Sequence, residues 1–213
     1  MIKWHPYLWL ECLALTVALP TILYIFPMRG AVFGILWLLT LVIIVAMYRK
    51  GAWKRKEIFR TDLVCWKELK PILFRFVLSA LVLGTGVALF EPERLLSLPQ
   101  EKPQLWMMIM VIYPLLSVFP QEVIFRTFFF WRYSEIFSNP RSLIYASGIA
   151  FGYVHVIFDN WVALLLSCIG GVLFAQTYDR TRSLALVWIE HALYGCFIFT
   201  IGLGWYFYSG AVR

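Results

Sequence analysis

Seven long apolar segments limit most strongly what this chain can fold into. Each is long enough to cross the hydrocarbon core of a bilayer as a helix of about 20 residues. The 213 residues are 62% hydrophobic and 15% charged, whereas a soluble domain is about half apolar and about a quarter charged. Because backbone groups inside lipid must hydrogen-bond internally, we predict an all-α, polytopic transmembrane helical bundle that forms a single domain over residues 1–213. The expected spans are about 6–27, 31–48, 71–90, 104–131, 142–158, 161–178 and 184–207.

The distribution of basic residues predicts the orientation of these spans. The longest loop, 49–70, carries eight Lys and Arg residues, and such loops stay in the cytoplasm. Two spans precede it, so the N-terminus is expected in the cytoplasm as well. Loop 91–103 has no cationic excess and is expected outside. We therefore expect a multi-pass protein of the cell inner membrane whose net charge of +7 reflects topology and attraction to membrane lipids, with no nucleic acid as partner.

Segment 49–70 interleaves its basic residues with Trp53, Ile58, Phe59 and Trp66. This pattern predicts a basic cytoplasmic loop or a helix lying in the headgroup plane. The four cysteines are scattered and form no CxxC pair, so neither a disulfide framework nor a thiolate metal site is expected.

The fourth apolar segment contains the group Gln121, Glu122 and Arg126. On a helix, Glu122 and Arg126 are i, i+4 neighbours on one face. A charge at bilayer depth is costly, so it faces the protein interior and marks function by default. The structural alternative is a buried ion pair that only locks helices together.

Two histidines lie at a similar depth in other spans. At the helical rise of about 1.5 Å per residue, His191 lies about 10 Å inward from Leu184. His155 lies about 20 Å inward from Ser142 by the same measure, and Glu122 lies about 15 Å inward from Arg132. A lone intramembrane histidine is usually a packing residue, but three polar groups in one layer of the bilayer indicate a shared site.

Glutamate with two histidines in an apolar pocket suits hydrolysis. A carboxylate can take a proton from water, and imidazoles can orient that water, donate to an oxyanion or bind a divalent metal such as zinc. Candidate metal ligands are Glu122, His155 and His191. The chain has no HExxH motif, which excludes the familiar zinc-protease signature.

The same residues carry a resemblance to a known family. QExxxR at 121–126, FxxxH at 151–155 and the late His191 resemble the three motifs of the CAAX prenyl-protease and bacteriocin-processing family, whose pattern is EExxxR, FxxxH and HxxxN or HxxxD. The resemblance covers about 105–200. It implies a helical bundle around a cavity open to the cytoplasmic side, and intramembrane endoproteolysis of a membrane-proximal, lipidated or prenylated peptide.

The resemblance also implies roles for individual residues. Glu122 is expected to be the base or a water ligand, oriented by Arg126. His155 and His191 would polarise the carbonyl or hold the water, and Gln121 would donate to the substrate backbone. The family pattern does not require a metal.

Two departures from the family pattern leave alternatives open. The first glutamate of EExxxR is Gln121, which cannot take a proton from water, and the Asn or Asp position after the last histidine is Gly195. A catalytically impaired pseudoprotease that binds hydrophobic or lipidated peptides as an immunity or scaffold protein is therefore a second hypothesis. A proton-coupled carrier, with Glu11 as its one dedicated feature, is a third, although the repeated broken helices of carriers are absent.

Overall fold

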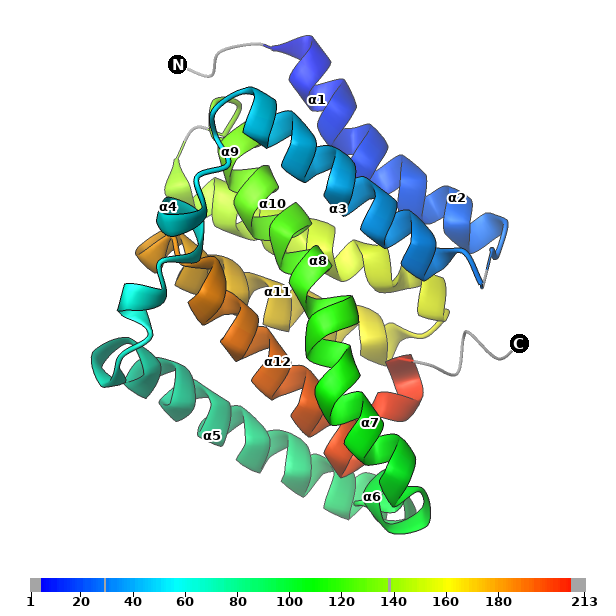
Figure 1. The fold of residues 1–213 in the computed structure, drawn as a ribbon. Coiled ribbons are helices and arrows are strands. Elements are labelled where there is room, and N and C mark those ends of the chain that lie inside the picture. The colour runs from blue at the N-terminus through cyan, green and yellow to red at the C-terminus, as the bar shows by residue number, and fades with distance from the viewer. Residues whose placement is uncertain (1–4, 29, 138, 208–213) are drawn as a thin grey trace.

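The computed structural model describes residues 5–28, 30–137 and 139–207. Within these residues, seven helices are long and apolar enough to cross a membrane, and no strand is present. The predicted all-α multi-pass bundle is therefore confirmed (Figure 1). The spans are Pro6–Ile25, Val32–Arg49 (α3), Trp66–Phe90 (α5), Pro103–Tyr133, Pro140–Phe158, Trp161–Thr181 (α11) and Leu184–Ile201 (α12).

Three of these spans change helical geometry along their length. The first comprises α1 (Pro6–Leu13), the π-helical turn η1 (Ala14–Ala18) and α2 (Leu19–Ile25). The fifth comprises α10 (Pro140–Tyr153) and the 3₁₀ turn η6 (Val154–Phe158). The fourth is composed of α7 (Pro103–Tyr113), η4 (Pro114–Val118, π), α8 (Phe119–Glu122), η5 (Val123–Phe128, π) and α9 (Phe129–Tyr133).

The last span lies at the centre of the bundle. In Figure 1, α12, α11 and α8 lie between α3 on one side and α5 on the other. Half of the α12 window is buried inside the protein, compared with 11% for α5. A polar side chain on α12 therefore has protein rather than lipid around it, which suits the placement of His191.

Prolines explain the irregular backbone of the fourth span. Proline has no N–H and its ring displaces the carbonyl four residues earlier, which frees backbone acceptors. The Leu116 carbonyl, four residues before Pro120, accepts from Trp37 Nε1 at 3.0 Å, and the Pro114 carbonyl accepts from Trp188 Nε1 at 2.7 Å. The π turn η4 is thus tied to α3 and α12, and π turns are frequent at functional sites.

Glycines bring α10 and α11 into direct backbone contact. A Cβ on Gly148 would lie 2.7 Å from the Val172 nitrogen, and one on Gly152 would lie 2.8 Å from the Cys168 nitrogen and Cα. Small residues four apart are the usual means by which membrane helices approach closely. Only Asp159 and Asn160 separate η6 from α11, so the two helices form a tight hairpin.

The segment 49–70 differs from a single interfacial helix. It forms α4 (Arg55–Phe59) and a 3₁₀ turn η2 (Thr61–Leu63), separated by Arg60 in the left-handed region (φ 42°), before α5 begins at Trp66. Ile58 is 7% exposed and packs into the protein core. Ile58, with the partly buried Trp53 and Phe59, therefore packs against the core, whereas Trp66 is 69% exposed.

The last span is shorter than expected. Helix α12 ends at Ile201, Gly202 takes φ 100°, and a separate 3₁₀ turn η7 (Leu203–Phe207) follows. A Cβ at Gly202 would lie 2.1 Å from the Arg94 carbonyl oxygen, so only glycine fits this turn.

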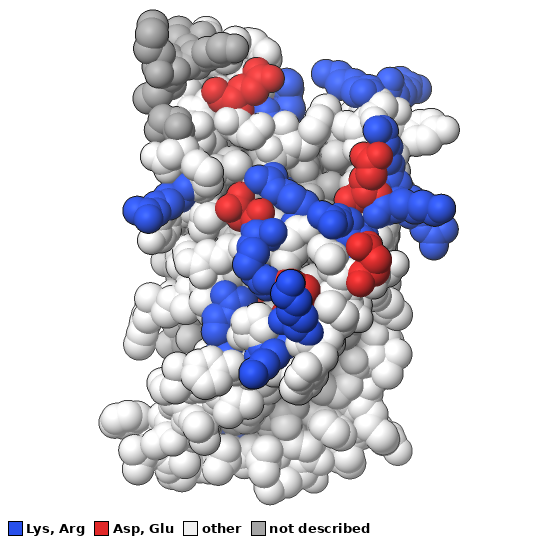
Figure 2. Space-filling view, turned by 90° about the vertical axis from the view of Figure 1, so that its left-hand side faces the viewer, with Lys and Arg blue, Asp and Glu red and all other residues white. Residues whose placement is uncertain are grey.

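Lys and Arg side chains gather on one face of the molecule, over the side where Figure 1 shows α4 and the start of α5 (Figure 2). We call this the basic face. Close to this end of the bundle, Arg132 at the end of α9 binds Glu11 of α1 through two contacts of 2.8 and 2.6 Å. Glu11, the residue assigned to the carrier hypothesis, therefore joins two helices.

The charge distribution predicts the membrane topology. Fusions truncated after Arg60 are expected to place a reporter in the cytoplasm, and fusions truncated after Lys102 are expected to place it outside, because basic loops are retained inside. Paired alkaline phosphatase and fluorescent-protein reporters measure both positions. Reporters on the same side would contradict the orientation.

The α10–α11 contact predicts a steric effect on stability. Gly152→Val is expected to lower the free energy of unfolding by about 1–3 kcal/mol, because the added atoms meet the Cys168 backbone. Gly84→Val, in α5 with nothing within 4 Å of its Cβ position, is the matched control. Thermal unfolding in detergent compares the two variants, and equal unfolding temperatures would count against the contact.

Candidate active site

A large apolar cavity lies inside the bundle. Its volume is about 1210 Å³, and residues from all seven spans line it. Most of its wall is aliphatic or aromatic. The polar side chains on the wall deeper in the bundle are Thr16, Ser79, Tyr113, Ser117, Gln121, Tyr133, His155, Ser167, His191 and Tyr194.

The cavity extends to the end of the bundle opposite the basic face. Its wall includes Met28, Lys102, Phe158 and Trp205, which lie at that end, and no residue of the segments 49–65, 134–142 and 179–186. At the other end, the buried aromatic side chains of Phe128, Phe129 and Tyr133 form its wall. The described lining therefore does not include the loops of the basic face, where the family resemblance places the opening.

Glu122 and His191 form a buried pair between α8 and α12. His191 Nδ1 lies 2.7 Å from Glu122 Oε1, and Arg126 Nε lies 3.1 Å from Glu122 Oε2. Glu122 and Arg126 are both 0% exposed. The carboxylate thus lies between an imidazole and a guanidinium, as expected for residues that share one polar layer.

Arg126 is held by α10 on its other side. Its Nη1 donates to Ser147 Oγ at 2.6 Å, and Ser147 Oγ donates to the Phe125 carbonyl at 2.6 Å. The guanidinium carbon lies 5.1 Å from the centre of the Phe151 ring. Neither Glu122 nor Arg126 is part of the cavity wall. Glu122 therefore acts on the cavity only through His191, and the expected direct role as base does not fit its position.

His191 presents its ring to the cavity. The ring stacks on Phe174 with centroids 4.7 Å apart and meets Phe151 edge-on at 5.2 Å. With Nδ1 donating to the Glu122 carboxylate, Nε2 is the acceptor, and Tyr113 Oη lies 3.2 Å from it. The three groups form a chain from a buried carboxylate to a hydroxyl on the cavity wall.

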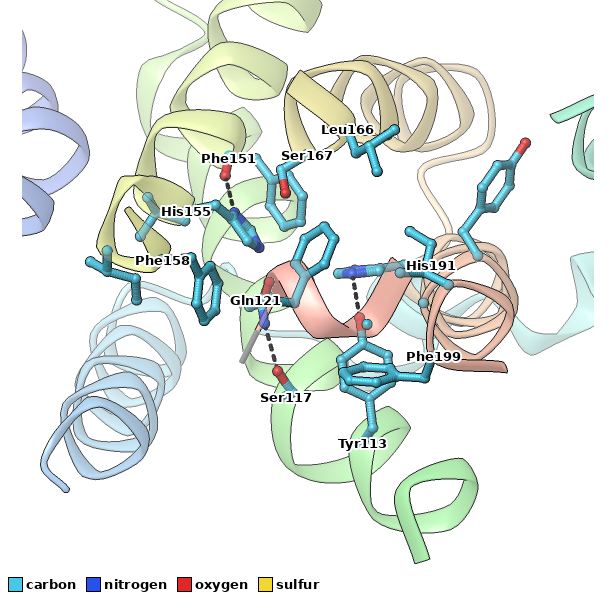
Figure 3. A pocket seen from close by; sticks show the side chains of 18 of the residues that line it. Tyr113, Ser117, Gln121, Phe151, His155, Phe158, Leu166, Ser167, His191 and Phe199 are labelled. Carbon is cyan, nitrogen blue, oxygen red and sulfur yellow. Dashed lines mark hydrogen bonds between the residues drawn. The ribbon is translucent and has the colours of Figure 1, made fainter. Parts of the chain in front are cut away.

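His155 lies across the cavity wall on the 3₁₀ turn η6. Its Nδ1 donates to the Phe151 carbonyl at 2.8 Å, so the other ring nitrogen carries a lone pair. Figure 3 shows this ring pointing into the pocket toward Gln121. Phe158 and Phe207 lie beside the His155 ring, with centroids 5.7 and 5.9 Å away.

Gln121 also faces the cavity, but with an acceptor instead of the expected donor. Its Nε2 donates to Ser117 Oγ at 2.8 Å, while Oε1 is buried without a hydrogen-bond partner. A buried unpaired acceptor is costly, so Oε1 of this wall residue is a candidate acceptor for a water or substrate group.

The expected site residues thus separate into two groups. Gln121, His155 and His191 line the cavity, and both histidine rings contact Phe151, at 4.9 and 5.2 Å between centroids. Glu122 and Arg126 support His191 from behind the wall.

The described part of the chain does not fit a three-residue metal site. No group of three His, Cys, Asp or Glu side chains is close enough to hold an ion there. Both nitrogens of His191 already have partners, Glu122 and Tyr113. The proposed zinc ligands Glu122, His155 and His191 therefore do not assemble around a common point.

Sequence reasoning missed a second buried ion pair. Arg75 Nη2 of α5 lies 2.8 Å from Glu190 Oε1 of α12 and donates to Thr177 Oγ1 of α11 at 2.7 Å. Both charges stand alone in apolar spans, a signal that could have identified them. Tyr113 was also missed, and nothing in the sequence distinguishes it from the other ten tyrosines.

The comparison with known families agrees with this geometry. A family model described as type II CAAX prenyl endopeptidase Rce1-like matches residues 103–197. None of the curated proteins and none of the solved structures matches the chain at a significant level. The matched residues include Gln121, Glu122, Arg126, His155 and His191. The resemblance to the CAAX prenyl-protease family that the three motifs indicated is therefore confirmed over residues 103–197.

Proposed function

We propose that this protein is an intramembrane endopeptidase that hydrolyses a membrane-proximal, lipidated peptide. One observation carries the proposal: two histidines present their rings to the same apolar cavity, and a buried glutamate holds one of them from behind. The match to a CAAX prenyl endopeptidase family supports it.

His155 is the proposed general base. Its Nδ1 is committed to the Phe151 carbonyl, which leaves the Nε2 lone pair for a water molecule in the cavity. Nε2 takes one proton as the water oxygen attacks the peptide carbonyl, and the same proton then passes to the leaving nitrogen. The products are a carboxylic acid, which then gives its proton to solvent, and an amine.

Gln121 and His191 complete the proposed site. Gln121 Oε1 accepts a hydrogen bond from the attacking water or a substrate N–H, and so orients it without taking a proton. Glu122 fixes the tautomer of His191 by accepting from Nδ1, as carboxylates do for histidines in hydrolase triads. Arg126 lies beside the other oxygen of Glu122, with Nε 3.1 Å from Oε2.

The cavity suggests the substrate class. Its volume of about 1210 Å³ exceeds the roughly 300–1000 Å³ of ordinary small-molecule pockets. An apolar wall of this extent suits a hydrocarbon chain, with the peptide bond lying at the polar group of histidines and Gln121. A prenylated peptide has this composition.

A second candidate function is binding without cleavage. The observation that favours it is the carboxamide at Gln121, in the position where the family pattern has a glutamate. A pseudoprotease would hold the lipidated peptide in the cavity and release it intact. Binding with no product in a purified system would decide for this alternative.

The base is tested by His155→Gln. We expect kcat/KM on a quenched fluorescent prenylated peptide to fall by about 10²–10⁴-fold, which is the usual contribution of general-base catalysis. His5→Gln, which changes a histidine that does not line the cavity, is the matched control and should cleave like the parent. Equal rates for the parent and His155→Gln, with both folded, would exclude His155 as the base.

The carboxamide is tested by Gln121→Glu. We expect turnover to rise by at least tenfold, because a carboxylate at this place can take the proton that glutamine cannot. A Ser117→Ala variant, which removes the partner of Gln121 Nε2 and adds no base, serves as the comparison. If the parent binds the peptide without cleaving it, and only the Gln121→Glu variant cleaves, the protein is a pseudoprotease. If Gln121→Glu does not raise the rate, the result counts against the assigned geometry.

A further inference from the structure

The position one helical turn after His191 is filled by a side chain from another helix. Gly195 lies at i+4 from His191, so a side chain there would share its face of α12. A Cβ at Gly195 would lie 2.3 Å from Tyr113 Cε1 and 2.3 Å from Tyr113 Oη. The hydroxyl of Tyr113 therefore occupies the space of a residue-195 side chain.

Three contacts fix α7 and η4 against α12 around this point. Trp106 Nε1 donates to Thr200 Oγ1 at 3.0 Å, and Trp188 Nε1 donates to the Pro114 carbonyl at 2.7 Å. Between them, Cys196 Sγ lies 4.0 Å from the Met110 carbonyl oxygen. Along the two helices, these contacts lie on both sides of Tyr113 and Gly195. The packing of α7 and η4 against α12 therefore holds the two residues close together.

The Tyr113 hydroxyl is also part of the site. Its oxygen lies 3.2 Å from His191 Nε2, and its ring packs edge-on against Phe199 with centroids 5.3 Å apart. Figure 3 shows Tyr113 and His191 joined at the pocket wall, with Gln121 and His155 on the other side. A donor at this place faces the region where the peptide carbonyl would lie.

We propose that Tyr113 supplies, from α7, the polar group that Gly195 lacks on α12, and that its hydroxyl donates to the carbonyl oxygen of the bound peptide. This inference rests on the proposed function. In the resting site the hydroxyl donates to His191 Nε2. When water attacks and negative charge develops on the carbonyl oxygen, the same O–H turns to that oxygen, so only a hydrogen bond changes partner and Tyr113 keeps its proton.

The catalytic role is tested by Tyr113→Phe, which keeps the ring and removes the hydroxyl. We expect kcat on the prenylated peptide to fall by about 10²–10³-fold, as when one oxyanion donor is lost, with little change in KM. Tyr145→Phe, at a tyrosine 54% exposed on α10, is the matched control. An unchanged kcat in folded Tyr113→Phe would overturn the proposal while leaving the proposed function intact.

The shared space is tested by exchanging the two residues. Gly195→Asn should lower the unfolding temperature because its Cβ meets Tyr113, and Gly34→Asn, with nothing within 4 Å, should not. In the double variant Tyr113→Ala/Gly195→Asn, the carboxamide introduced at position 195 occupies the space that the Tyr113 side chain leaves. It can also donate the hydrogen bond that the Tyr113 hydroxyl donated. We expect this double variant to unfold at a higher temperature than Gly195→Asn and to turn over at least tenfold faster than Tyr113→Ala.

The outcomes of the exchange separate the two proposals. If the effects of Tyr113→Ala and Gly195→Asn on the unfolding temperature and on the turnover rate simply add in the double variant, the inference is overturned. A parent that does not cleave would reject the proposed function and with it the catalytic role of Tyr113. The exchange of space between positions 113 and 195 would then be judged by the unfolding temperatures alone.

Discussion

The structure depends on the carboxylate of Glu122, which lies inside an apolar helix bundle without contact with water. Glu122 is wholly buried in the fourth span and is compensated by His191 on one oxygen and Arg126 beside the other. Removing one partner of a buried pair typically costs about 3–5 kcal/mol, because it leaves an uncompensated charge. The pair therefore constrains α8, η5 and α12, and through Ser147 also α10. The structural and catalytic interpretations of this cluster are compatible, since the same contacts that hold the helices also orient His191.

The second pair, Arg75 with Glu190, extends this arrangement to α5. Glu190 precedes His191 in sequence, but its side chain points toward α5 and α11. There Arg75 forms an ion pair with Glu190 and donates a hydrogen bond to Thr177. Helix α12 thus presents two adjacent polar residues, about 100° apart around the helix, to different neighbouring helices. This explains why the most central helix of the protein is also one with charged and polar residues in its middle: it is surrounded by partners instead of lipid.

Hydropathy alone was enough to predict the seven spans, because the length and composition of a membrane helix follow from the thickness of the bilayer. The site residues could also be found, since isolated charges and histidines in apolar segments are conspicuous. The sequence could not show which of these site residues line the cavity wall and which lie behind it. This division depends on the irregular path of the fourth span, in which Glu122 and Arg126 do not line the cavity, and on the close packing that brings Tyr113 against Gly195. Contacts of this kind arise between helices far apart in sequence. The aromatic end of the cavity could not be predicted for the same reason, because Phe128, Phe129 and Tyr133 look like any other apolar residues in the chain.

The aromatic wall at one end of the cavity has a consequence for the cell as well as for the site. Hydrolysis at mid-membrane needs water deep in the bilayer, and a water-filled passage through both ends would conduct protons and dissipate the electrochemical gradient. The buried rings of Phe128, Phe129 and Tyr133 form the cavity wall toward the end of the bundle where α9 ends. A protein arranged in this way can hydrate its interior from a single side while the membrane keeps its electrical insulation.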